Sequence, residues 1–305
     1  MCQARRLPVV PGYRLMGILN VTPDSFSDGG LYLDAQAAVQ HGLELVGQGA
    51  DILDIGGEST RPGAEPVEVE EEKRRVIPVI EALAAATRSL PEPPQLSIDT
   101  RKAAVARPAL AAGAALVNDV SALRADPEMA AVVADSDADC CLMHMLGEPR
   151  TMQRGPRYGN VVDDVRAFLE ERLSFAVGQG ISESRVVLDP GIGFGKTAAH
   201  NLELLRRLGE IVAVGRPVLV GTSRKSFLGV LAAEKTGALR ARAEGAEAGP
   251  VPAAERLPGT IATNVMAFER GASVFRVHDV APVADALAVA AATLSGKWTA
   301  SPTTS

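Results

Sequence analysis

Eight short apolar runs, each followed by a stretch of helical periodicity, constrain this 305-residue chain more than any other feature of its sequence. The runs are Tyr13–Asn20, Asp51–Gly57, Gln95–Thr100, Leu116–Val120, Cys140–Met145, Val186–Gly191, Pro217–Ser223 and Ser273–His278. The periodic stretches include Ala35–Gly47, Val69–Ala86, Arg101–Ala111, Val161–Val177, Asn201–Val212 and Ile261–Arg270. Continuous apolar strands that alternate with helices indicate parallel strands buried on both faces. The sequence therefore predicts a single-domain α/β fold, a closed (β/α)8 TIM barrel.

Polar residues lie at or near the end of every apolar run. They are Asn20, Asp54, Asp99, Asn118, His144, Asp189, Ser223 and Arg276, with His278 just beyond. The carboxyl ends of barrel strands surround one common mouth, where barrel enzymes hold their catalytic groups. An open, doubly wound sheet is the alternative fold, but its ligand site would use only the strands near the switch point. Polar residues at all eight ends therefore favour the barrel.

The barrel is expected to account for nearly the whole chain. We expect an N-terminal extension over residues 1–14 and the barrel domain over residues 15–298. One stretch, Ala232–Leu257, breaks the alternating pattern, because it is rich in Ala, Gly and Glu and contains Pro250 and Pro252. It predicts a surface insertion near residues 232–257. The Ser/Thr/Pro-rich residues 299–305 predict a disordered tail.

Charge and cysteine content argue against several classes of protein. The formal net charge is −6 and there is no long basic run, whereas a nucleic-acid-binding protein needs a positive face. Of the three cysteines, two are adjacent, and an odd, sparse count suits a reducing cytosol. We see neither an apolar stretch near the ~20 residues of a membrane span nor a signal peptide. We therefore expect a cytoplasmic protein that binds neither nucleic acid nor membranes.

Several motifs look like known catalytic signatures but fail their tests. In Asp189–Thr197, a P-loop would need Gly where Pro190 stands, and a dinucleotide fingerprint would need Gly where Lys196 stands. Gly221–Lys225 lacks the glycine two places after the serine that a nucleophile elbow requires. The histidines are isolated, so no spacing suggests zinc. The glycines of Asp189–Thr197 are better explained as a tight turn at the mouth of a barrel.

Single strand-end residues also have structural explanations. Asp99 and Thr100 can cap the helix that follows them, and Asn118 and Asp119 can close a turn. His278 can be a hydrogen-bonded core histidine, and Lys225 can lie on a solvated helix face. These structural roles remain open for each residue taken alone, but the occurrence of polar residues at all eight strand ends favours a common site.

The segments at the strand ends resemble the dihydropteroate synthase family. The matching motifs are Met16–Gly30, Asp54–Gly63, Ser97–Thr100, Asn118–Val120, Met143–His144, Asp189–Lys196, Ser223–Lys225 and Arg276–Val280. They follow the family's order from residue 16 to residue 280, and the first, second and sixth are the most specific. None of these motifs departs from the family's pattern. The one departure is the insertion over residues 232–257, which lies outside the motifs.

This resemblance implies an SN1-like transfer of the pterin-methyl group of 6-hydroxymethyl-7,8-dihydropterin pyrophosphate to the amine of 4-aminobenzoate, with release of pyrophosphate. It implies that Asp99, Asn118, Asp189 and Lys225 hold the pterin. These residue types suit the task, because the pterin edge is a row of donors beside acceptors. Asp99 would also stabilise the pterin cation as a fixed negative charge.

The resemblance assigns further groups to the other reactants. The residues expected to bind pyrophosphate are Thr60, Arg61, Arg276 and His278. The residues expected around 4-aminobenzoate are Phe194, Ser223 and Arg224. The residues expected to act in catalysis are Asp99, Lys225, Arg276 and His278. Family members use Mg2+ through the residue that matches Asn20, where it would neutralise charge on the leaving oxygens, and they commonly form homodimers.

Two other functions compete with this interpretation. A pterin-binding methyltransferase that acts on methyltetrahydrofolate would need neither the Thr22–Gly30 loop nor a pyrophosphate clamp at Arg276 and His278. A non-catalytic pterin-binding paralogue would be expected to have lost Asp99, Lys225 or the loop motifs.

The loops Thr22–Gly30 and Glu58–Gly63 are rich in Gly, Ser, Pro and Asp, so we expect them to close over bound substrate as a lid.

Overall fold

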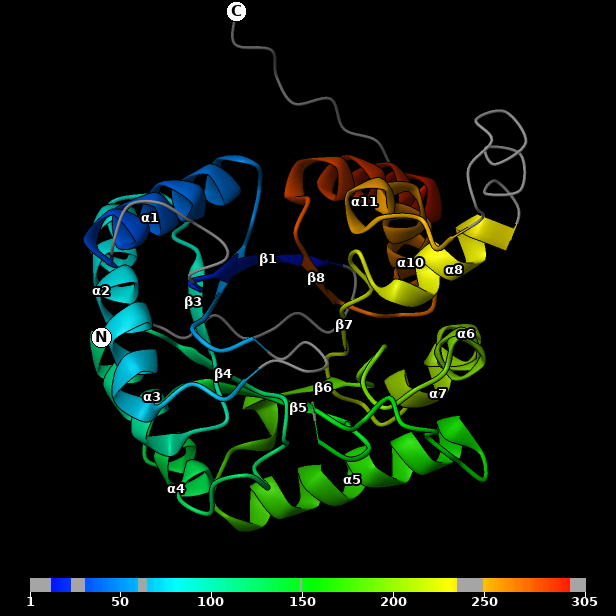
Figure 1. Ribbon diagram of the computed structural model, residues 1–305, viewed down its shortest axis with the longest axis horizontal. Coiled ribbons are helices and arrows are strands. Elements are labelled where there is room, and N and C mark those ends of the chain that lie inside the picture. Colours follow the sequence, from blue (N-terminus) through cyan, green and yellow to red (C-terminus); the bar gives the residue numbers. More distant parts are fainter. Residues whose placement is uncertain (1–11, 23–30, 60–64, 149, 235–248, 297–305) are drawn as a thin grey trace, which may run out of the picture.

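In a computed structural model, the chain forms a barrel of parallel strands enclosed by helices (Figure 1). The structure describes residues 12–22, 31–59, 65–148, 150–234 and 249–296. The strands are β1 (Arg14–Asn20), β2 (Ile52–Gly56), β3 (Gln95–Asp99), β4 (Leu116–Asp119), β5 (Asp139–Met143), β6 (Val186–Asp189), β7 (Leu219–Val220) and β8 (Val274–Val277). They form one sheet in the order β6-β5-β4-β3-β2-β1-β8-β7, and every described pairing is parallel.

The two ends of this sheet meet, which closes the barrel. Leu188 of β6 forms a parallel bridge with Val218, just before β7. The Leu188 amide donates to the Pro217 carbonyl at 2.9 Å. The sheet therefore has no open edge at which two halves diverge, and the predicted (β/α)8 barrel is confirmed over the open doubly wound alternative.

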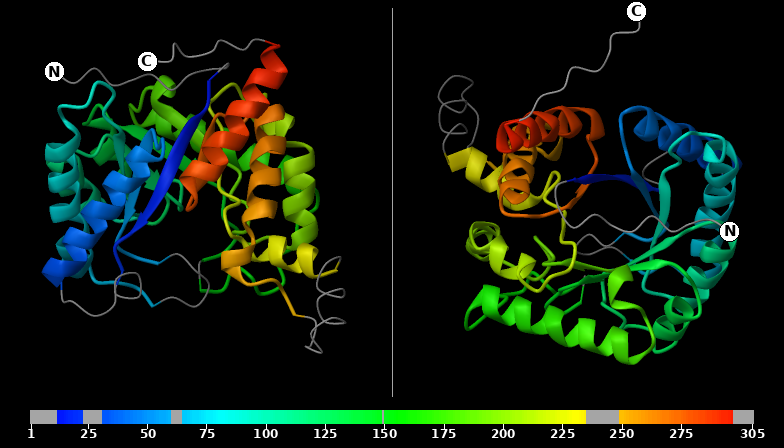
Figure 2. Two further views of the ribbon diagram at one scale, coloured as in Figure 1. Left: turned by 90° about the horizontal axis from the view of Figure 1, so that it is seen from above. Right: turned by 180° about the vertical axis from the view of Figure 1, so that it is seen from behind.

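Helices surround the strands on the outside of the barrel (Figure 2). They are α1 (Leu31–Gly47), α2 (Val69–Thr87), α3 (Ala103–Ala112), α4 (Met129–Ala134), α5 (Val161–Gly178), α6 (Ala198–Arg206), α7 (Leu208–Val212), α8 (Ser226–Ala232), α10 (Leu257–Glu269) and α11 (Val280–Ser295), with 3-10 turns at Glu183–Arg185 and Ala253–Glu255. The predicted helix Asn201–Val212 is two helices, because the backbone leaves the helical region at Arg207 (φ −104°, ψ 23°). The sequence patterns did not single out α4, α8 or α11.

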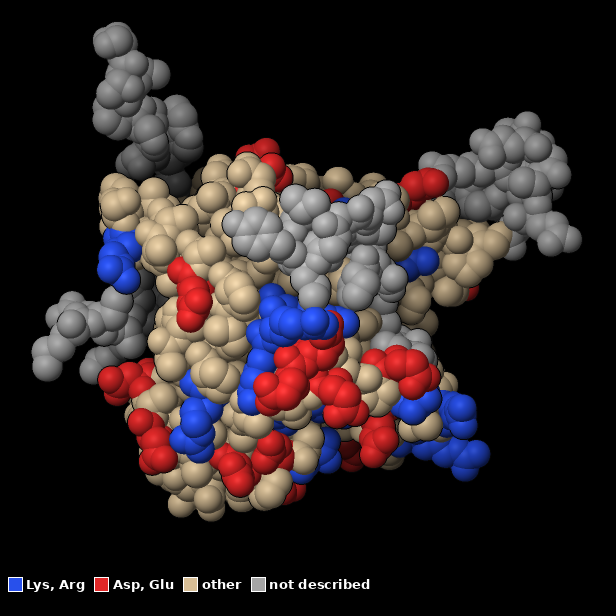
Figure 3. Space-filling model, turned by 60° about the vertical axis from the view of Figure 1, so that its left-hand side comes forward, with Lys and Arg blue, Asp and Glu red and all other residues tan. Residues whose placement is uncertain are grey.

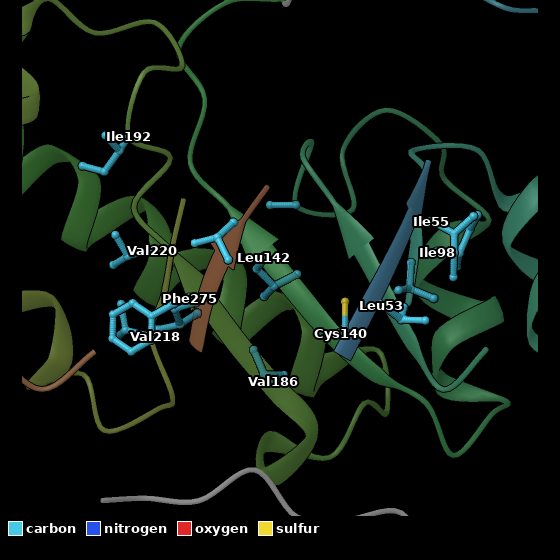
Figure 4. Packing of buried hydrophobic residues seen from close by; sticks show 14 of the residues in the cluster. Leu53, Ile55, Ile98, Cys140, Leu142, Val186, Ile192, Val218, Val220 and Phe275 are labelled. Carbon is cyan, nitrogen blue, oxygen red and sulfur yellow. The ribbon is translucent and has the colours of Figure 1, made fainter. Parts of the chain in front are cut away.

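Side chains alternate between the inside and the outside of the barrel, as the period of two in a strand requires. The outward residues pack under the helices in the main core, which includes Leu53, Ile98, Leu142, Val220 and Phe275 (Figure 4). The inward residues form a separate apolar cluster with one side chain from each of seven strands. That cluster is Met16, Ile52, Leu116, Cys141, Val187, Leu219 and Val274. It fills the barrel interior, so the structure is a packed core and not a pore.

Several expectations fall wholly or partly on residues outside the described part of the chain. These are most of the N-terminal extension, most of the first loop (23–30), residues 60–64 with Thr60 and Arg61, residues 235–248 of the insertion, and the tail. The described end of the insertion packs against the barrel. Val251 is buried, and its amide donates to the Gly229 carbonyl of α8 at 3.1 Å.

Candidate active site

A layer of polar side chains lies directly above the apolar cluster inside the barrel. In four strands, the inward residue two places after the cluster member is polar. The pairs are Ile52 and Asp54, Leu116 and Asn118, Val187 and Asp189, and Val274 and Arg276. Asp99 completes the layer from β3. Because side chains two apart in a strand point to the same side, one register places all five groups in the mouth of the barrel.

Arg276 links two of the carboxylates. Its Nε donates to Asp54 Oδ2 at 2.6 Å, and its Nη2 donates to Asp99 Oδ2 at 2.8 Å. Asp54 is fully buried and Asp99 is 8% exposed, whereas the Arg276 side chain remains 23% exposed. Charged hydrogen bonds of this kind, withdrawn from water, hold the guanidinium in one orientation. The sequence prediction placed Arg276 and Asp99 together but left Asp54 out of the site.

Asn118 belongs to the same network. Its Nδ2 donates to Asp54 Oδ2 at 3.0 Å, and Ser97 Oγ donates to Asp54 Oδ1 at 2.6 Å. The neighbouring Asp119 points the other way and closes the following turn, accepting from the Ser121 and Leu123 amides at 2.7 and 2.8 Å. The turn predicted as a structural role for Asn118 and Asp119 is therefore formed by Asp119, whereas Asn118 points into the polar layer.

Asp189 ends β6 beside a glycine-rich turn. Its Oδ1 accepts from the Gly191 amide at 2.6 Å. Gly191 has φ of +65°, and a Cβ atom there would lie 1.9 Å from the His144 carbonyl oxygen. Only glycine fits that approach, so the tight turn predicted for this motif is a requirement of the backbone. The following Thr197 caps α6, where Thr197 Oγ1 accepts from the His200 amide at 3.2 Å.

Lys225 and Phe194 meet across the mouth. The Lys225 ammonium lies 4.0 Å from the centre of the Phe194 ring, a cation–π contact. No hydrogen-bond acceptor for this ammonium is found among the described residues, so its donors remain available to a ligand. Lys225 immediately precedes α8 and is half-buried over Phe194, which excludes the solvated helix face as its location.

Burial changes the acidity of these groups. Burial, and next the charge of Asp54, raises the pKa of Asp99 to about 7, while Arg276 lowers it. Burial raises the pKa of Asp189 to about 6, although the hydrogen bond from the Gly191 amide and the charge of Lys225 both lower it. Burial, and next the charge of Arg276, lowers the pKa of Lys225 to about 8. Perturbed groups of both signs at one end of a barrel are typical of a site that binds a polar ligand.

The loop after β7 is locked to the end of β8. Ser223 Oγ lies 2.9 Å from His278 Nδ1 and accepts from the His278 amide at 3.1 Å. Arg224 adopts φ of +57°, a left-handed conformation that is costly for a residue with a side chain. Its guanidinium makes two hydrogen bonds to Asp279, at 3.0 and 2.6 Å. The strain is compensated by neighbours that hold the loop in this form.

Lys196 is a buried lysine that sequence reasoning did not single out. Its ammonium lies 2.9 Å from His144 Nδ1 and 3.0 Å from each of the Gly191 and Phe194 carbonyl oxygens. Burial, and next the charge of Lys196, lowers the pKa of His144 to about 3, so the imidazole is neutral and accepts at Nδ1. His144 therefore supports the turn after β6. The sequence feature that could have identified this role is the position of Lys196 at the end of a Gly-rich turn, because such a turn needs internal hydrogen bonds.

Thr100 and Glu72 anchor the region beside the second loop. Thr100 Oγ1 donates to the buried Glu72 at 2.7 Å, and Lys102 Nζ donates to Glu72 at 2.6 Å. Lys102 also pairs with Glu58, which precedes residues 60–64. Thr100 Oγ1 also accepts from the Lys102 amide at 3.3 Å, but Lys102 is itself the N-cap of α3, and this helix has no side-chain cap hydrogen bond. Neither Thr100 nor Asp99 therefore caps α3, and Asp99 turns inward to Arg276.

Asn20 ends β1 at the mouth, half-buried and paired in register with Gly56 of β2. Its amide oxygen is a hard donor of the kind Mg2+ prefers. No group of three or more His, Cys, Asp or Glu side chains able to hold a metal occurs in the described part of the chain. A single amide ligand still fits Mg2+, because this ion commonly keeps waters and takes further oxygens from substrate phosphates.

The surface bears on the expected partners. On the face seen in Figure 3, basic and acidic side chains are interspersed, with no continuous basic patch in view. Within the described ranges, no helix has both the length and the apolar character that crossing a membrane requires.

Comparison with known proteins agrees with this geometry. Residues 16–278 match the family model described as pterin binding enzyme. Dihydropteroate synthase of Escherichia coli (strain K12) is 43% identical over 283 residues, which cover 93% of this chain and 92% of that protein.

Two solved structures from Xanthomonas albilineans are also similar. Its dihydropteroate synthase with 4-aminobenzoic acid superposes with a TM-score of 0.81 at 48% identity, covering 93% of this chain and 94% of that one. The same enzyme in complex with 7,8-dihydropteroate gives a TM-score of 0.79 at 44% identity, covering 95% and 97%. The similarity extends over the fold and nearly the full length, and the chain belongs to the dihydropteroate synthase family of pterin-binding enzymes.

Proposed function

We propose that this protein is a transferase that joins 6-hydroxymethyl-7,8-dihydropterin pyrophosphate to 4-aminobenzoate, forming 7,8-dihydropteroate and pyrophosphate. The observation that carries the proposal is the polar layer above the apolar cluster, in a chain similar over most of its length to dihydropteroate synthases. One such relative is solved with 4-aminobenzoic acid and with 7,8-dihydropteroate.

The pterin would lie against Asp189, Asn118, Asp99 and Lys225. Asp189 Oδ2 has no hydrogen bond among the described residues, and the Lys225 ammonium likewise lacks an acceptor there. Asn118 uses an N–H toward Asp54, which turns its amide oxygen away from Asp54. A ligand edge with paired donors beside a carbonyl matches this set of acceptors and one cation.

The pyrophosphate would lie against Arg276 and His278, together with Thr60 and Arg61 of the second loop. Arg276 keeps Nη1 without a partner among the described residues, while its Nε–H and one N–H of Nη2 are held by Asp54 and Asp99. A guanidinium with two sites already fixed presents the third in a set direction, which suits a phosphate oxygen. We also propose that Mg2+, held by Asn20 and phosphate oxygens, neutralises charge on the leaving group.

The reaction would begin at the bond between the pterin methylene carbon and the pyrophosphate oxygen. That bond breaks, and both its electrons leave with pyrophosphate. The resulting cation is delocalised over the pterin, and the ionised Asp99 stabilises it electrostatically. The lone pair of the aromatic amine then forms the new C–N bond, and the nitrogen loses a proton to solvent. Asp99, Lys225, Arg276 and His278 are the groups we assign to catalysis.

The 4-aminobenzoate pocket would involve Phe194, Ser223 and Arg224. Phe194 offers an aromatic face beside Lys225, and Ser223 lies on the same loop as Lys225. The Arg224 guanidinium is engaged by Asp279, so Arg224 would contribute chiefly through the shape of its strained backbone. This modifies the expected contribution of Arg224 and leaves its assignment to the pocket in place.

Pyrophosphate release, measured with and without 4-aminobenzoate, tests the proposed activity. With Mg2+, the pterin substrate and the amine present, we expect dihydropteroate and pyrophosphate in equal amounts. Methyl transfer from methyltetrahydrofolate without pyrophosphate release would identify the methyltransferase instead. Pterin binding without either product would identify the non-catalytic paralogue.

We further propose a cytoplasmic homodimer. The described cysteines, Cys140 and Cys141, are free and buried, which agrees with a reducing compartment. Several of the exposed large apolar side chains lie on four neighbouring helices. They are Leu202 of α6, Val230 of α8, Met266 of α10, and Val289 and Leu294 of α11. Helix α10 contacts the other three, so a second copy could cover this side. Sedimentation equilibrium would give the mass of a dimer, or of a monomer if this assignment is wrong.

A further inference from the structure

Among the residues that the structure describes, Asp54 is the polar group in the mouth that bonds to two proposed substrate-binding side chains at once. Its Oδ2 accepts from Asn118 Nδ2 at 3.0 Å and from Arg276 Nε at 2.6 Å. Its Oδ1 accepts from Ser97 Oγ at 2.6 Å. The side chain is fully buried in the middle of β2, below the ends of the neighbouring strands.

We propose that Asp54 is a positioning residue, which orients the Asn118 amide and the Arg276 guanidinium so that their remaining polar groups face the pterin substrate. The inference rests on the proposed function, since it specifies how that substrate is recognised. Asp54 itself is buried beneath these two residues and acts through them.

The orientation of the Asn118 amide follows from the chemistry of Asp54. An ionised carboxylate accepts hydrogen bonds and cannot donate them. The Asn118 atom facing Asp54 must therefore be the nitrogen, and its oxygen is turned to the opposite side. Without a carboxylate at position 54, both orientations of the amide become available. Asp54 thereby makes Asn118 an acceptor for a donor on the pterin ring.

The orientation of Arg276 depends on Asp54 in a similar way. Asp54 holds Nε on one side of the guanidinium, and Asp99 holds Nη2 on the other. Two fixed hydrogen bonds determine the plane of this rigid group. Loss of Asp54 would leave Arg276 attached to Asp99 alone, free to rotate away from the pyrophosphate position.

Asp54 also acts on Asp99 through its charge. The charges that act on Asp99 come from Asp54 of β2, Glu72 of α2, Asp119 of β4 and Arg276 of β8, with Lys225 following β7. After burial, Asp54 is the largest influence that raises the pKa of Asp99. Removing the charge of Asp54 also frees Arg276 to pair more fully with Asp99, so both effects lower that pKa.

Asp54→Asn tests the inference, because asparagine keeps the size of the side chain while removing its charge and one acceptor. In this variant the dissociation constant for the pterin pyrophosphate should rise by about tenfold or more. The KM for 4-aminobenzoate at saturating pterin should change by less than about twofold. The acidic limb of the kcat/KM profile should move to lower pH, a shift that a merely structural role would not produce.

A double variant shows whether Asp54 acts through Asn118. If it does, Asn118→Ala should cost much less pterin affinity in the Asp54→Asn background than in the wild type. Asp139→Asn is the matched control, because Asp139 is a buried carboxylate at the opposite end of the barrel, bonded to Gln95 at 2.8 Å. It should leave the pterin affinity and the pH profile unchanged.

The outcomes separate the inference from the proposed function. A wild-type protein that forms no dihydropteroate would defeat the function. An active wild type, with an unchanged pterin affinity and pH profile in Asp54→Asn or with additive losses in the double variant, would overturn the role of Asp54. If Asp54→Asn does not fold, amide exchange in the wild type decides. One Asn118 side-chain N–H should be protected by its bond to Asp54, and absence of protection would refute the inference.

Discussion

At the scale of single residues, the mouth of the barrel is a balance between buried charges. Asp54, Asp99 and Asp189 face Lys225 and Arg276, and burial moves the pKa of Asp99, Asp189 and Lys225 toward neutrality. Nearby cations oppose this shift in the two carboxyl groups, because Arg276 lowers the pKa of Asp99 and Lys225 lowers the pKa of Asp189. Substitutions here should therefore separate substrate affinity from turnover.

Asp189→Asn and Asp99→Asn should have different effects. Asp189→Asn replaces a carboxylate that can accept two donors from the pterin with an amide that presents a single acceptor oxygen. Pterin binding should weaken by about 1.5–3 kcal/mol, the usual scale of a charged hydrogen bond. Asp99→Asn should lower kcat more than pterin affinity, because its charge matters most when the cation forms. Calorimetry and steady-state kinetics on both variants check this, and unchanged pterin affinity in Asp189→Asn would refute its role.

Activity and stability should respond in opposite directions to the ionisation of Asp99. The raised pKa means that, between about pH 4 and pH 7, the folded protein binds more protons at this residue than the unfolded chain does. The stability of the wild type relative to Asp99→Asn should thus fall as pH rises through this range. Over the same range kcat/KM should rise, and it should fall again above about pH 8 as Lys225 loses its proton.

Urea unfolding of both proteins and pH–rate profiles measure the two trends. The change of the stability difference with pH tests the raised pKa of Asp99. If the wild type instead gains stability relative to Asp99→Asn from pH 4 to pH 7, the pKa of Asp99 is not raised in the folded protein.

At the scale of elements, the strand pattern was predictable and the loops were not. Alternation along β2, β4, β6 and β8 follows from the sequence, because a parallel barrel strand has one register of inward residues. The turns depend on tertiary contacts that a single sequence does not display. Arg224 takes a left-handed conformation held by Asp279, 55 positions away in the chain, and Lys196 meets His144 on the preceding strand's loop. Short helices such as α4 carry too few residues for a clear period.

Lys196→Met should loosen the turn that carries Phe194. The substitution keeps an apolar side chain of similar length but removes the donor to the Gly191 and Phe194 carbonyls and to His144. Leaving these acceptors unsatisfied should cost about 1–3 kcal/mol of stability. The KM for 4-aminobenzoate should rise several-fold, with a smaller change for the pterin. Amide exchange of residues 191–196 should accelerate, and slow exchange with an unchanged KM would show that Lys196 does not hold the turn.

The insertion should divide into a removable part and a needed part. Replacing residues 235–248 with a brief linker should leave kcat within about twofold of wild type, since loop length affects stability only weakly. Arg256→Gln should instead raise the KM for 4-aminobenzoate, because Arg256 donates to the carbonyl of the strained Arg224 at 2.9 Å and to Val251 at 2.7 Å. Kinetics on both variants test the boundary; an inactive but folded deletion would place residues 235–248 in the site.

At the scale of the whole molecule, the barrel supplies one apolar layer for stability and one polar layer for binding. The number of units and the buried strands were enough to predict the closed barrel and the polar strand ends that meet at its mouth. The resemblance supplied the reaction, and neither source indicated that Asp54 joins Asn118 to Arg276. That link joins residues far apart in the chain, and it depends on closure of the sheet between β1 and β8.

The most direct test is a crystal structure of the protein soaked with 7,8-dihydropteroate. We predict difference density for the pterin ring between Asp189, Asn118 and Lys225, with the donor edge of the ring on Asp189 and the aminobenzoate portion beside Phe194. Arg276 should retain its bonds to Asp54 and Asp99. Density for the product anywhere outside the mouth of the barrel, or a mouth that stays empty at saturating product, would contradict it.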